Sequence, residues 1–283
     1  MTLTGTDKNL YSVWAERDTT TIMLYNVGYC PELKQIASNP LFSGISVKEV
    51  SNTSVQITLT HKKSDFTFGY SAELTDTSLI LSFRNPISIS SGSKPLKGIN
   101  IIVDPGHSDS TGSVSFWAAT NYTEAYINLT ISRLVKAKLE ALGATVSLSH
   151  NGEQKYSLDE LISQMRMSDP DMTISLHMDH PGQGNGVNPV NNKGATSYYC
   201  YGAGKLLSDT MIKTYASKTG LNMRGSKVGR YKVARHMQYP AVLFEMGFIS
   251  NIYDFEWFVA DGGFDAAAQA VTDGILAYYK AQS

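Results

Sequence analysis

Cysteine and long apolar runs are both scarce in this 283-residue sequence. Its two cysteines, Cys30 and Cys200, lie far apart, which excludes a disulfide scaffold and a thiolate zinc site, so we expect two free thiols. No apolar run approaches the roughly 20 residues of a membrane span, and none is predicted. The N-terminus, MTLTGTDKNLYS, lacks the layout of a signal peptide, which predicts either a cytosolic protein or one whose signal has been removed.

An excess of charge of one sign is also missing. The 24 Lys and Arg residues nearly balance the 25 Asp and Glu residues, giving a formal net charge of -1. Without a basic excess, we predict no nucleic-acid partner. Hydrophobic residues make up 42% of the chain, which is enough for a folded core and excludes a disordered protein.

The first third of the chain has the pattern of an all-β module. From residue 8 to 86, short runs rich in β-branched and aromatic residues alternate with Asn, Ser, Gly and Asp turns, which predicts a small sandwich. Residues 85–98 are rich in Ser, Gly and Pro and have the composition of a linker. We therefore expect a β-rich auxiliary module with its linker over 1–96, and a second domain over 97–283.

Strands alternate with helices in this second domain, which predicts an α/β fold with a mixed, largely parallel sheet flanked by helices. Residues 122–142 carry apolar side chains at helical spacing, and Gly143 follows where a helix C-cap belongs. Further strands are expected at 100–104, 144–149, 171–177, 196–201 and 240–248, and further helices at 158–167, 205–220 and 264–280.

Two of the predicted strands end in histidine. INIIVDPGH ends at His107 and TISLH ends at His177, while a third strand, PAVLFEMGF, carries Glu245 in an apolar setting. Ligands of open α/β sheets bind at the carboxyl ends of the strands, so these three side chains can converge. Residues 104–106, Asp-Pro-Gly, would turn the chain sharply and lift His107 over the edge of the sheet.

Glu124, at the start of the helix after His107, completes a candidate metal site. Two neutral imidazoles and a carboxylate form a donor set that suits Zn²⁺ and leaves the fourth tetrahedral position for water. The sequence therefore suggests zinc held by His107, Glu124 and His177, with Glu245 as the base that takes a proton from that water.

Each of these residues has a structural alternative. A histidine beyond a strand end is commonly a polar loop residue, and Asn121 and Glu124 have the spacing of a capping box, which spacing alone favours. Glu245 can instead be a buried carboxylate paired with Arg235. The remaining histidines are expected at the surface or in loops: His61, His150, His180 and His236.

Four segments occur in order between about residue 95 and the C-terminus: PLKGINIIVDPGH, EAYINL, ISLHMD and PAVLFEMGFISN. Together they resemble the zinc-dependent N-acetylmuramoyl-L-alanine amidases of the amidase-3 type. The resemblance implies zinc as cofactor, held by His107, Glu124 and His177, with Glu245 as the catalytic acid/base. It also implies peptidoglycan as substrate, cut between N-acetylmuramic acid and L-alanine, and a location in the cell wall, the periplasm or outside the cell.

The resemblance leaves several points open. A zinc carboxypeptidase or endopeptidase acting on the stem peptide uses the same metal chemistry, and an inactive wall-binding protein is a third reading. The β-rich module would attach the enzyme to the wall or serve only a structural role.

The chain also departs from the family pattern beside the expected site. Residues 108–111 replace a Gly-rich turn, His150 and Leu161 stand where Arg is common, and Asp179 and His180 replace an Asn and a small residue. Residues 181–194 are short and rich in Gly, Pro and Asn, so we expect no inhibitory helix there and an open site.

Overall fold

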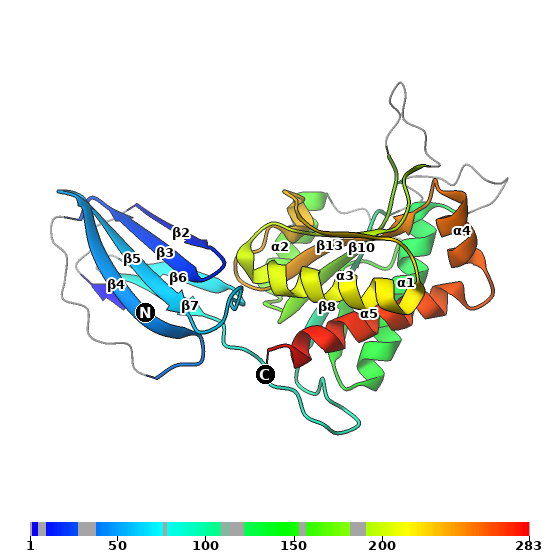
Figure 1. Ribbon diagram of the computed structural model, residues 1–283, viewed down its shortest axis with the longest axis horizontal. Helices are drawn as coiled ribbons and strands as arrows, with labels where there is room; N and C mark the ends of the chain where they lie inside the picture. The colour runs from blue at the N-terminus through cyan, green and yellow to red at the C-terminus, as the bar shows by residue number, and fades with distance from the viewer. Residues whose placement is uncertain are drawn as a thin grey trace.

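The computed structural model describes residues 2–4, 10–27, 38–75, 78–108, 112, 122–152, 157–181 and 191–282. A β-rich unit is followed by an α/β unit, and the two lie side by side along the long axis of the molecule (Figure 1). Cys200 is a free thiol, as predicted, whereas Cys30 lies outside the described residues. No helix in the described ranges combines the length and apolar character that a bilayer crossing requires.

The β-rich unit consists of two antiparallel sheets. One has the order β1 (Thr2–Thr4), β7 (Ser78–Phe83), β6 (Tyr70–Leu74), and the other β2 (Tyr11–Ala15), β3 (Thr19–Tyr25), β5 (Ser54–His61), β4 (Phe42–Ser51). Alternate residues of β3, β5 and β7 share one core: Ile22, Leu24, Val55, Ile57, Leu59, Leu79 and Leu81. The predicted β-rich region is therefore confirmed, and its strands are antiparallel.

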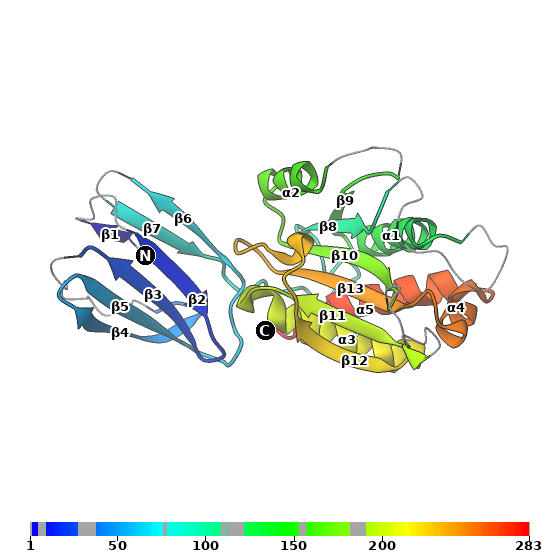
Figure 2. The ribbon, with the colours of Figure 1, turned by 90° about the horizontal axis from the view of Figure 1, so that it is seen from above.

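The α/β unit is built on a six-stranded sheet, seen from above in Figure 2. Its order is β12 (Met223–Val228), β11 (Ala195–Tyr199), β13 (Ala241–Phe248), β10 (Met172–Asp179), β8 (Asn100–Pro105), β9 (Thr145–Leu148). All neighbouring pairs are parallel except β11 and β13. The predicted mixed, largely parallel sheet is confirmed, but β12 and helix α4 (Ile252–Val259) were not predicted.

Helices cover the two faces of this sheet unequally. The long helices α1 (Glu124–Ala141), α3 (Lys205–Thr219) and α5 (Gly263–Lys280) lie together against one face (Figure 1). Their apolar sides pack on alternate strand residues in one core that includes Val103, Ile131, Ile174, Leu176, Val242, Phe244 and Val271. The other face is covered by α2 (Leu158–Met167) and by the 3₁₀ turn η3 (Lys232–Ala234), which contact each other.

Strand alternation determines which residues reach the second face. Because successive side chains point to opposite faces, Ser175 and His177 of β10 point away from the apolar core that holds Ile174 and Leu176. Register partners of adjacent parallel strands share a face, and the structure pairs Ser175 with Asp104 and His177 with Glu245. The sheet therefore presents polar groups on the side opposite α1 and α5.

Helix α1 begins at Glu124, with Thr123 as its N-cap. The Thr123 hydroxyl accepts a hydrogen bond from the backbone N–H of Tyr126, at 3.2 Å. Glu124 is thus the first helical residue and not the third, so the capping-box interpretation is wrong; Asn121 lies outside the described residues. Gly143 follows the C-cap residue with a φ of 96°, as its expected role requires.

Residues 84–99 have no regular secondary structure, yet they are packed against both units. Leu96 is fully buried in the core of the α/β unit, and the backbone N–H of Ile87 donates to Gln282 Oε1 at 2.7 Å. Phe66 and Phe68 of the β-rich unit belong to the same hydrophobic core as the central strands. The segment has the composition of a linker but does not act as a free tether.

We predict that Phe68→Ala lowers the free energy of unfolding of the whole chain by about 3–5 kcal/mol, because it empties part of this shared core. Phe68 is only 3% exposed and contacts Phe66 edge to face. Denaturant unfolding measures the change. Tyr253→Ala, at a position 67% exposed, is the matched control and should change stability by no more than about 0.5 kcal/mol. Equal midpoints for the two variants would contradict the shared core.

Candidate metal centre and catalytic residues

His107 leaves the end of β8 in an uncommon backbone conformation. Its φ is 63°, in the left-handed region that a residue with a side chain rarely adopts. Strand β8 continues through Pro105, so the chain bends from Gly106 onward and not over residues 104–106 as predicted. The two preceding carbonyls are both held: Pro105 O lies 2.6 Å from His150 Nε2, and Gly106 O accepts from Asn128 Nδ2 at 3.0 Å. These contacts stabilise the conformation that presents His107 to the site.

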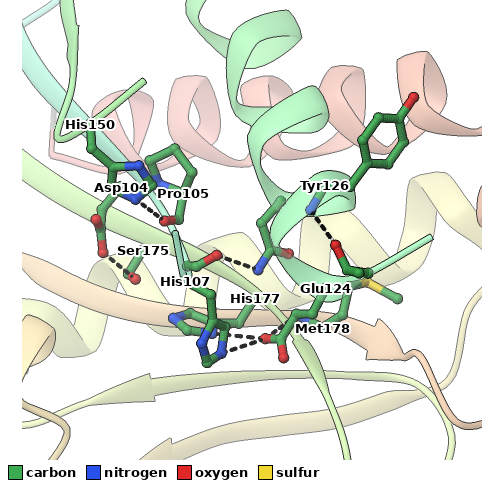
Figure 3. A network of polar contacts seen from close by, with 12 residues as sticks. Asp104, Pro105, His107, Glu124, Tyr126, His150, Ser175, His177 and Met178 are labelled. Carbon is green, nitrogen blue, oxygen red and sulfur yellow. Dashed lines mark hydrogen bonds and ion pairs between the residues drawn. The ribbon is translucent and has the colours of Figure 1, made fainter. Parts of the chain in front are cut away.

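His150 is a structural donor beneath this turn. Its Nδ1 accepts a hydrogen bond from the backbone N–H of Gly152, so Nε2 carries the proton and donates to Pro105 O (Figure 3). His150 lies in a loop, as expected, but is only 7% exposed, and His236 is likewise a buried loop residue. For His61 the expectation is wrong, because it is the last residue of strand β5 and is buried.

Asp104 connects the strands under the site. This carboxylate is buried, its Oδ1 accepts from the Ser149 hydroxyl at 2.5 Å, and its Oδ2 accepts from the Ser175 hydroxyl at 2.6 Å. Both oxygens of a buried carboxylate are thereby hydrogen-bonded, which offsets its desolvation. The contacts fix the end of β8 relative to β10 and to the residue that follows β9.

The three predicted ligands lie together, because both histidines contact the same carboxylate oxygen of Glu124. Oε1 of Glu124 lies 3.0 Å from His177 Nδ1 and 3.2 Å from His107 Nε2. Figure 3 draws both contacts as dashed lines. One donor atom from each residue falls within 4.8 Å of the others. The His177 ring packs over Gly106, where a methyl group would lie 2.5 Å from Nδ1, so residue 106 must lack a side chain.

The contacts within this cluster shift the pKa values of Glu124 and His107 in opposite directions. Burial acts to raise the pKa of Glu124. The hydrogen bonds from His107 and His177 together have a larger effect than burial and hold that pKa well below its ordinary value. The hydrogen bond to Glu124 in turn raises the pKa of His107, against the opposing effect of burial. Glu124 is therefore an ionised carboxylate although it is only 4% exposed.

Glu245 lies beside His177 on the same face of the sheet. The two are register partners on adjacent strands, which places their backbones about 4.8 Å apart. Burial raises the pKa of Glu245 well above its ordinary value, and the negative charges of Asp179 and Glu124 add to the shift. Its Oε2 is buried and has no hydrogen-bond partner in the part of the chain that the structure describes.

Arg235 does not pair with Glu245. It is exposed, and its Nε donates to the carbonyl of Arg230 at 2.7 Å. The structural interpretation of Glu245 as half of a buried ion pair is therefore wrong. Among the described residues no cation pairs with Glu245, and a buried carboxyl of this kind is more typical of a catalytic group than of a structural one.

A cavity of about 330 Å³ extends from the two histidines across the sheet. His107 and His177 border it, and its other walls include residues of α2, of β13 and of the segment around η3: Leu158, Leu161, Leu243, Tyr231, Lys232 and Val233. His150 also lines it, so two of the departures from the family pattern, at 150 and 161, lie in its wall. Residues 109–111 and 182–190, which bear on loop shape and on an inhibitory helix, lie outside the described residues.

The donor set fits a zinc ion. At Zn–N and Zn–O distances of about 2.0–2.2 Å, tetrahedral ligand atoms lie about 3.3 Å apart, close to the 3.0 and 3.2 Å separations in the cluster. Two imidazole nitrogens and one carboxylate oxygen also match the ligand types of catalytic zinc sites with three protein ligands.

Comparisons with known proteins all point to one family of amidases. Residues 101–277 match the Amidase_3 profile, described as N-acetylmuramoyl-L-alanine amidase. N-acetylmuramoyl-L-alanine amidase LytC of Bacillus subtilis is 31% identical over 191 residues, covering 66% of this chain and 36% of LytC. The probable cell wall amidase LytH of Staphylococcus epidermidis is 30% identical over 194 residues, covering 69% of this chain and 63% of LytH. The matches therefore span only part of these relatives.

Solved structures show the same fold. The catalytic domain of CwlV, an N-acetylmuramoyl-L-alanine amidase from Bacillus (Paenibacillus) polymyxa var. colistinus, has a TM-score of 0.58 and 25% identity, covering 64% of this chain and 98% of that one. AmiC2 of Nostoc punctiforme has the same TM-score at 23% identity, covering 65% and 99%. The profile match spans the histidine and glutamate cluster and Glu245. This chain belongs to the Amidase_3 family of N-acetylmuramoyl-L-alanine amidases.

Proposed function

We propose that this protein is a zinc-dependent amidase of peptidoglycan, which cuts the amide bond between the lactyl group of N-acetylmuramic acid and L-alanine. The observation that carries the proposal is that His107 and His177 both lie within hydrogen-bond distance of one carboxylate oxygen of Glu124. Glu245 lies beside this cluster, and its buried Oε2 has no hydrogen-bond partner among the described residues. The relatives named as cell wall and muramoyl-alanine amidases support the substrate class.

In this proposal His107, Glu124 and His177 hold the metal, and Glu245 moves the proton. When bound, zinc supplies Lewis-acid polarisation of the scissile carbonyl and lowers the pKa of water to about 7. Glu245 accepts a proton from the attacking water and returns it to the departing alanine nitrogen. A raised pKa suits this double role, because a carboxyl with an ordinary pKa gives up its proton too readily to act as an acid.

The supporting residues act by fixing positions. His150 holds the carbonyl of Pro105 and Asn128 holds the carbonyl of Gly106. Asp104 fixes β8 relative to β10 through Ser175. The cavity between α2 and η3 would receive the part of the substrate that extends from the scissile bond. We also propose a location outside the cell, in the cell wall or periplasm, and an auxiliary role for the β-rich module over 1–96 in wall attachment or in structure.

The reaction is tested by digesting purified peptidoglycan and identifying the new end groups by mass spectrometry. Cleavage at the proposed bond releases new L-alanine amino termini and creates no new reducing sugar. New internal or D-amino ends would instead identify a peptidase of the stem peptide. Absence of any new end group with the zinc-loaded protein would contradict enzymatic activity altogether.

We predict that the purified protein binds close to one zinc per chain and that His177→Ala abolishes tight binding, because two remaining ligands rarely hold a catalytic zinc. Zinc content by elemental analysis and affinity by chelator competition measure this. His61→Gln is the control: His61 lies in the β-rich unit, hydrogen-bonded to Thr20, and its replacement should leave zinc binding unchanged. Full hydrolysis by verified metal-free protein would refute the metal assignment.

We predict that Glu245→Gln retains folding and zinc but loses activity on the order of 10²-fold or more, because an amide cannot exchange a proton at neutral pH. Glu256→Gln, the same chemical change at an exposed position of α4, is the matched control and should keep the parental rate. A Glu245→Gln protein that releases alanine termini at the parental rate would remove Glu245 from the mechanism.

A further inference from the structure

We propose that the β-rich unit positions one wall of the substrate cavity, with Arg84 and Gly69 as positioning residues. The wall is residues 229–240, which we call the wall segment. The inference rests on the proposed function, because the position of this wall matters only if the cavity receives the substrate. It assigns the β-rich unit a role in substrate binding in addition to any role in attachment.

The wall segment has little regular structure of its own. It follows β12, crosses the polar face of the sheet through η3, and ends at Pro240, where β13 begins. Tyr231, Lys232 and Val233 point from it into the cavity that starts at the two histidines. A segment with only one 3₁₀ turn depends on contacts with its neighbours to keep one conformation.

The β-rich unit supplies two backbone contacts at the far end of this segment. The backbone N–H of Tyr70, the first residue of β6, donates to the carbonyl of Met237 at 2.9 Å. The Nε of Arg84 donates to the carbonyl of Gln238 at 2.6 Å. Both hydrogen bonds are accepted by backbone carbonyls of the wall segment, so they constrain its path directly.

Gly69 permits this close approach. Its φ is 105°, and a methyl group added there would lie 2.5 Å from the carbonyl carbon of Gln238. Gly69 also accepts a hydrogen bond from the backbone N–H of Arg84 at 2.9 Å. Any other residue at 69 would clash with the wall segment and would hold a strained conformation.

Arg84 joins the wall segment to the start of the central strands. Its guanidinium forms an ion pair with Asp169, and its NH1 lies 3.4 Å from Asp171 Oδ1. The other oxygen of Asp171 accepts from the backbone N–H of Asn100, the first residue of β8. The side chains of Arg84 and Asp171 are 25% and 21% exposed, so their charge-assisted contact is less screened than a surface pair, whereas Asp169 is 75% exposed and its pair with Arg84 is more screened.

Contacts inside the wall segment connect this anchor with the cavity. The Tyr239 hydroxyl hydrogen-bonds with His236 Nδ1 at 2.7 Å, their rings stack, and both side chains are buried. At the other end, Tyr231 packs against Tyr198, with ring centroids 5.0 Å apart. The segment is thus packed between its anchored end and the cavity.

The contacts of the wall segment with α2 are weaker than this anchor. Lys232 pairs with Asp159 at 2.7 Å, but the two side chains are 46% and 81% exposed, and exposed pairs contribute little. Arg166 donates to the Arg235 carbonyl at 3.3 Å from an exposed position. The partly buried contacts of Arg84 are therefore the ones expected to hold the wall.

The decisive measurement compares Arg84→Ala with the parent in the full chain. We expect amide hydrogen exchange of residues 229–240 to accelerate about tenfold or more, because local opening becomes easier. We expect the KM for a soluble muropeptide to rise about fivefold while kcat changes less than about twofold, since the metal centre is untouched. Zinc content should stay at one per chain.

Lys205→Ala is the matched control. Lys205 forms an ion pair between the two units with Asp65, at 3.2 Å, but does not contact the wall segment. This variant removes the same charge from the same interface, so it should keep parental exchange at 229–240 and parental KM. If Lys205→Ala raises KM as much as Arg84→Ala does, the effect is a general loosening of the interface and the assignment to Arg84 is overturned.

Other outcomes are equally decisive. Parental exchange and KM in Arg84→Ala overturn the proposal, and faster exchange with an unchanged KM shows an anchor that does not serve substrate binding. If Arg84→Ala does not fold, Asp169→Asn replaces it, because Asn tolerates the positive φ of 40° there; a smaller change in the same direction is expected, and none overturns the proposal. A parent that releases no alanine termini refutes the proposed function, while hydrogen exchange still decides whether Arg84 anchors the wall.

Discussion

The architecture of the site depends on one oxygen atom, Oε1 of Glu124, which lies within hydrogen-bond distance of two imidazoles. This arrangement requires the end of β8, the end of β10 and the start of α1 to meet at one point. Gly106 must be bare so that the His177 ring can lie over it, and His107 must adopt a left-handed conformation to face the same oxygen. Burial of Glu124 is tolerated because both partners stabilise its charge.

Strand β10 shows how one element serves both core and site. Its even-numbered residues, such as Ile174 and Leu176, pack in the apolar core, and its odd-numbered residues Ser175 and His177 face the site. Rigid packing on one face therefore fixes the geometry on the other. Glu245 is a carboxyl whose buried Oε2 has no hydrogen-bond partner among the described residues, and there function and stability conflict.

Much of the site could be predicted from the sequence, because the strands of a parallel sheet run in the same direction and their carboxyl ends share one edge. Once IIVDPGH and TISLH are assigned as strands of one parallel sheet, their terminal histidines must meet at one edge, and Glu245 follows from an acidic residue inside an apolar strand. Spacing favoured a capping box formed by Asn121 and Glu124, and it failed because Thr123, whose residue type is also a good cap, stands directly before the helix. The burial of His150 had no local signal, since its partner is a backbone carbonyl.

No pattern in the sequence predicted how the two units contact each other. The contacts of Tyr70 and Arg84 with the wall segment go to backbone carbonyls, which every residue offers, so no motif marks them. Strand β12 escaped prediction because it lies at the edge of the sheet, largely exposed, and MRGSKV lacks an apolar alternation. The linker composition of 85–98 likewise indicated missing regular structure but could not show that Leu96 is buried.

The direction of the strands has a spatial consequence for the whole molecule. The β-rich unit contacts the chain just before β10 and β13 begin, through Asp171 and Gln238, whereas His177 lies near the other end of β10. The eight residues of β10 span about 26 Å, so the two ends of the sheet are separated by roughly that length. Wall attachment through the β-rich unit would therefore place the holding surface and the metal cluster toward opposite ends of the central strands, and a tethered molecule would work on neighbouring material within its reach.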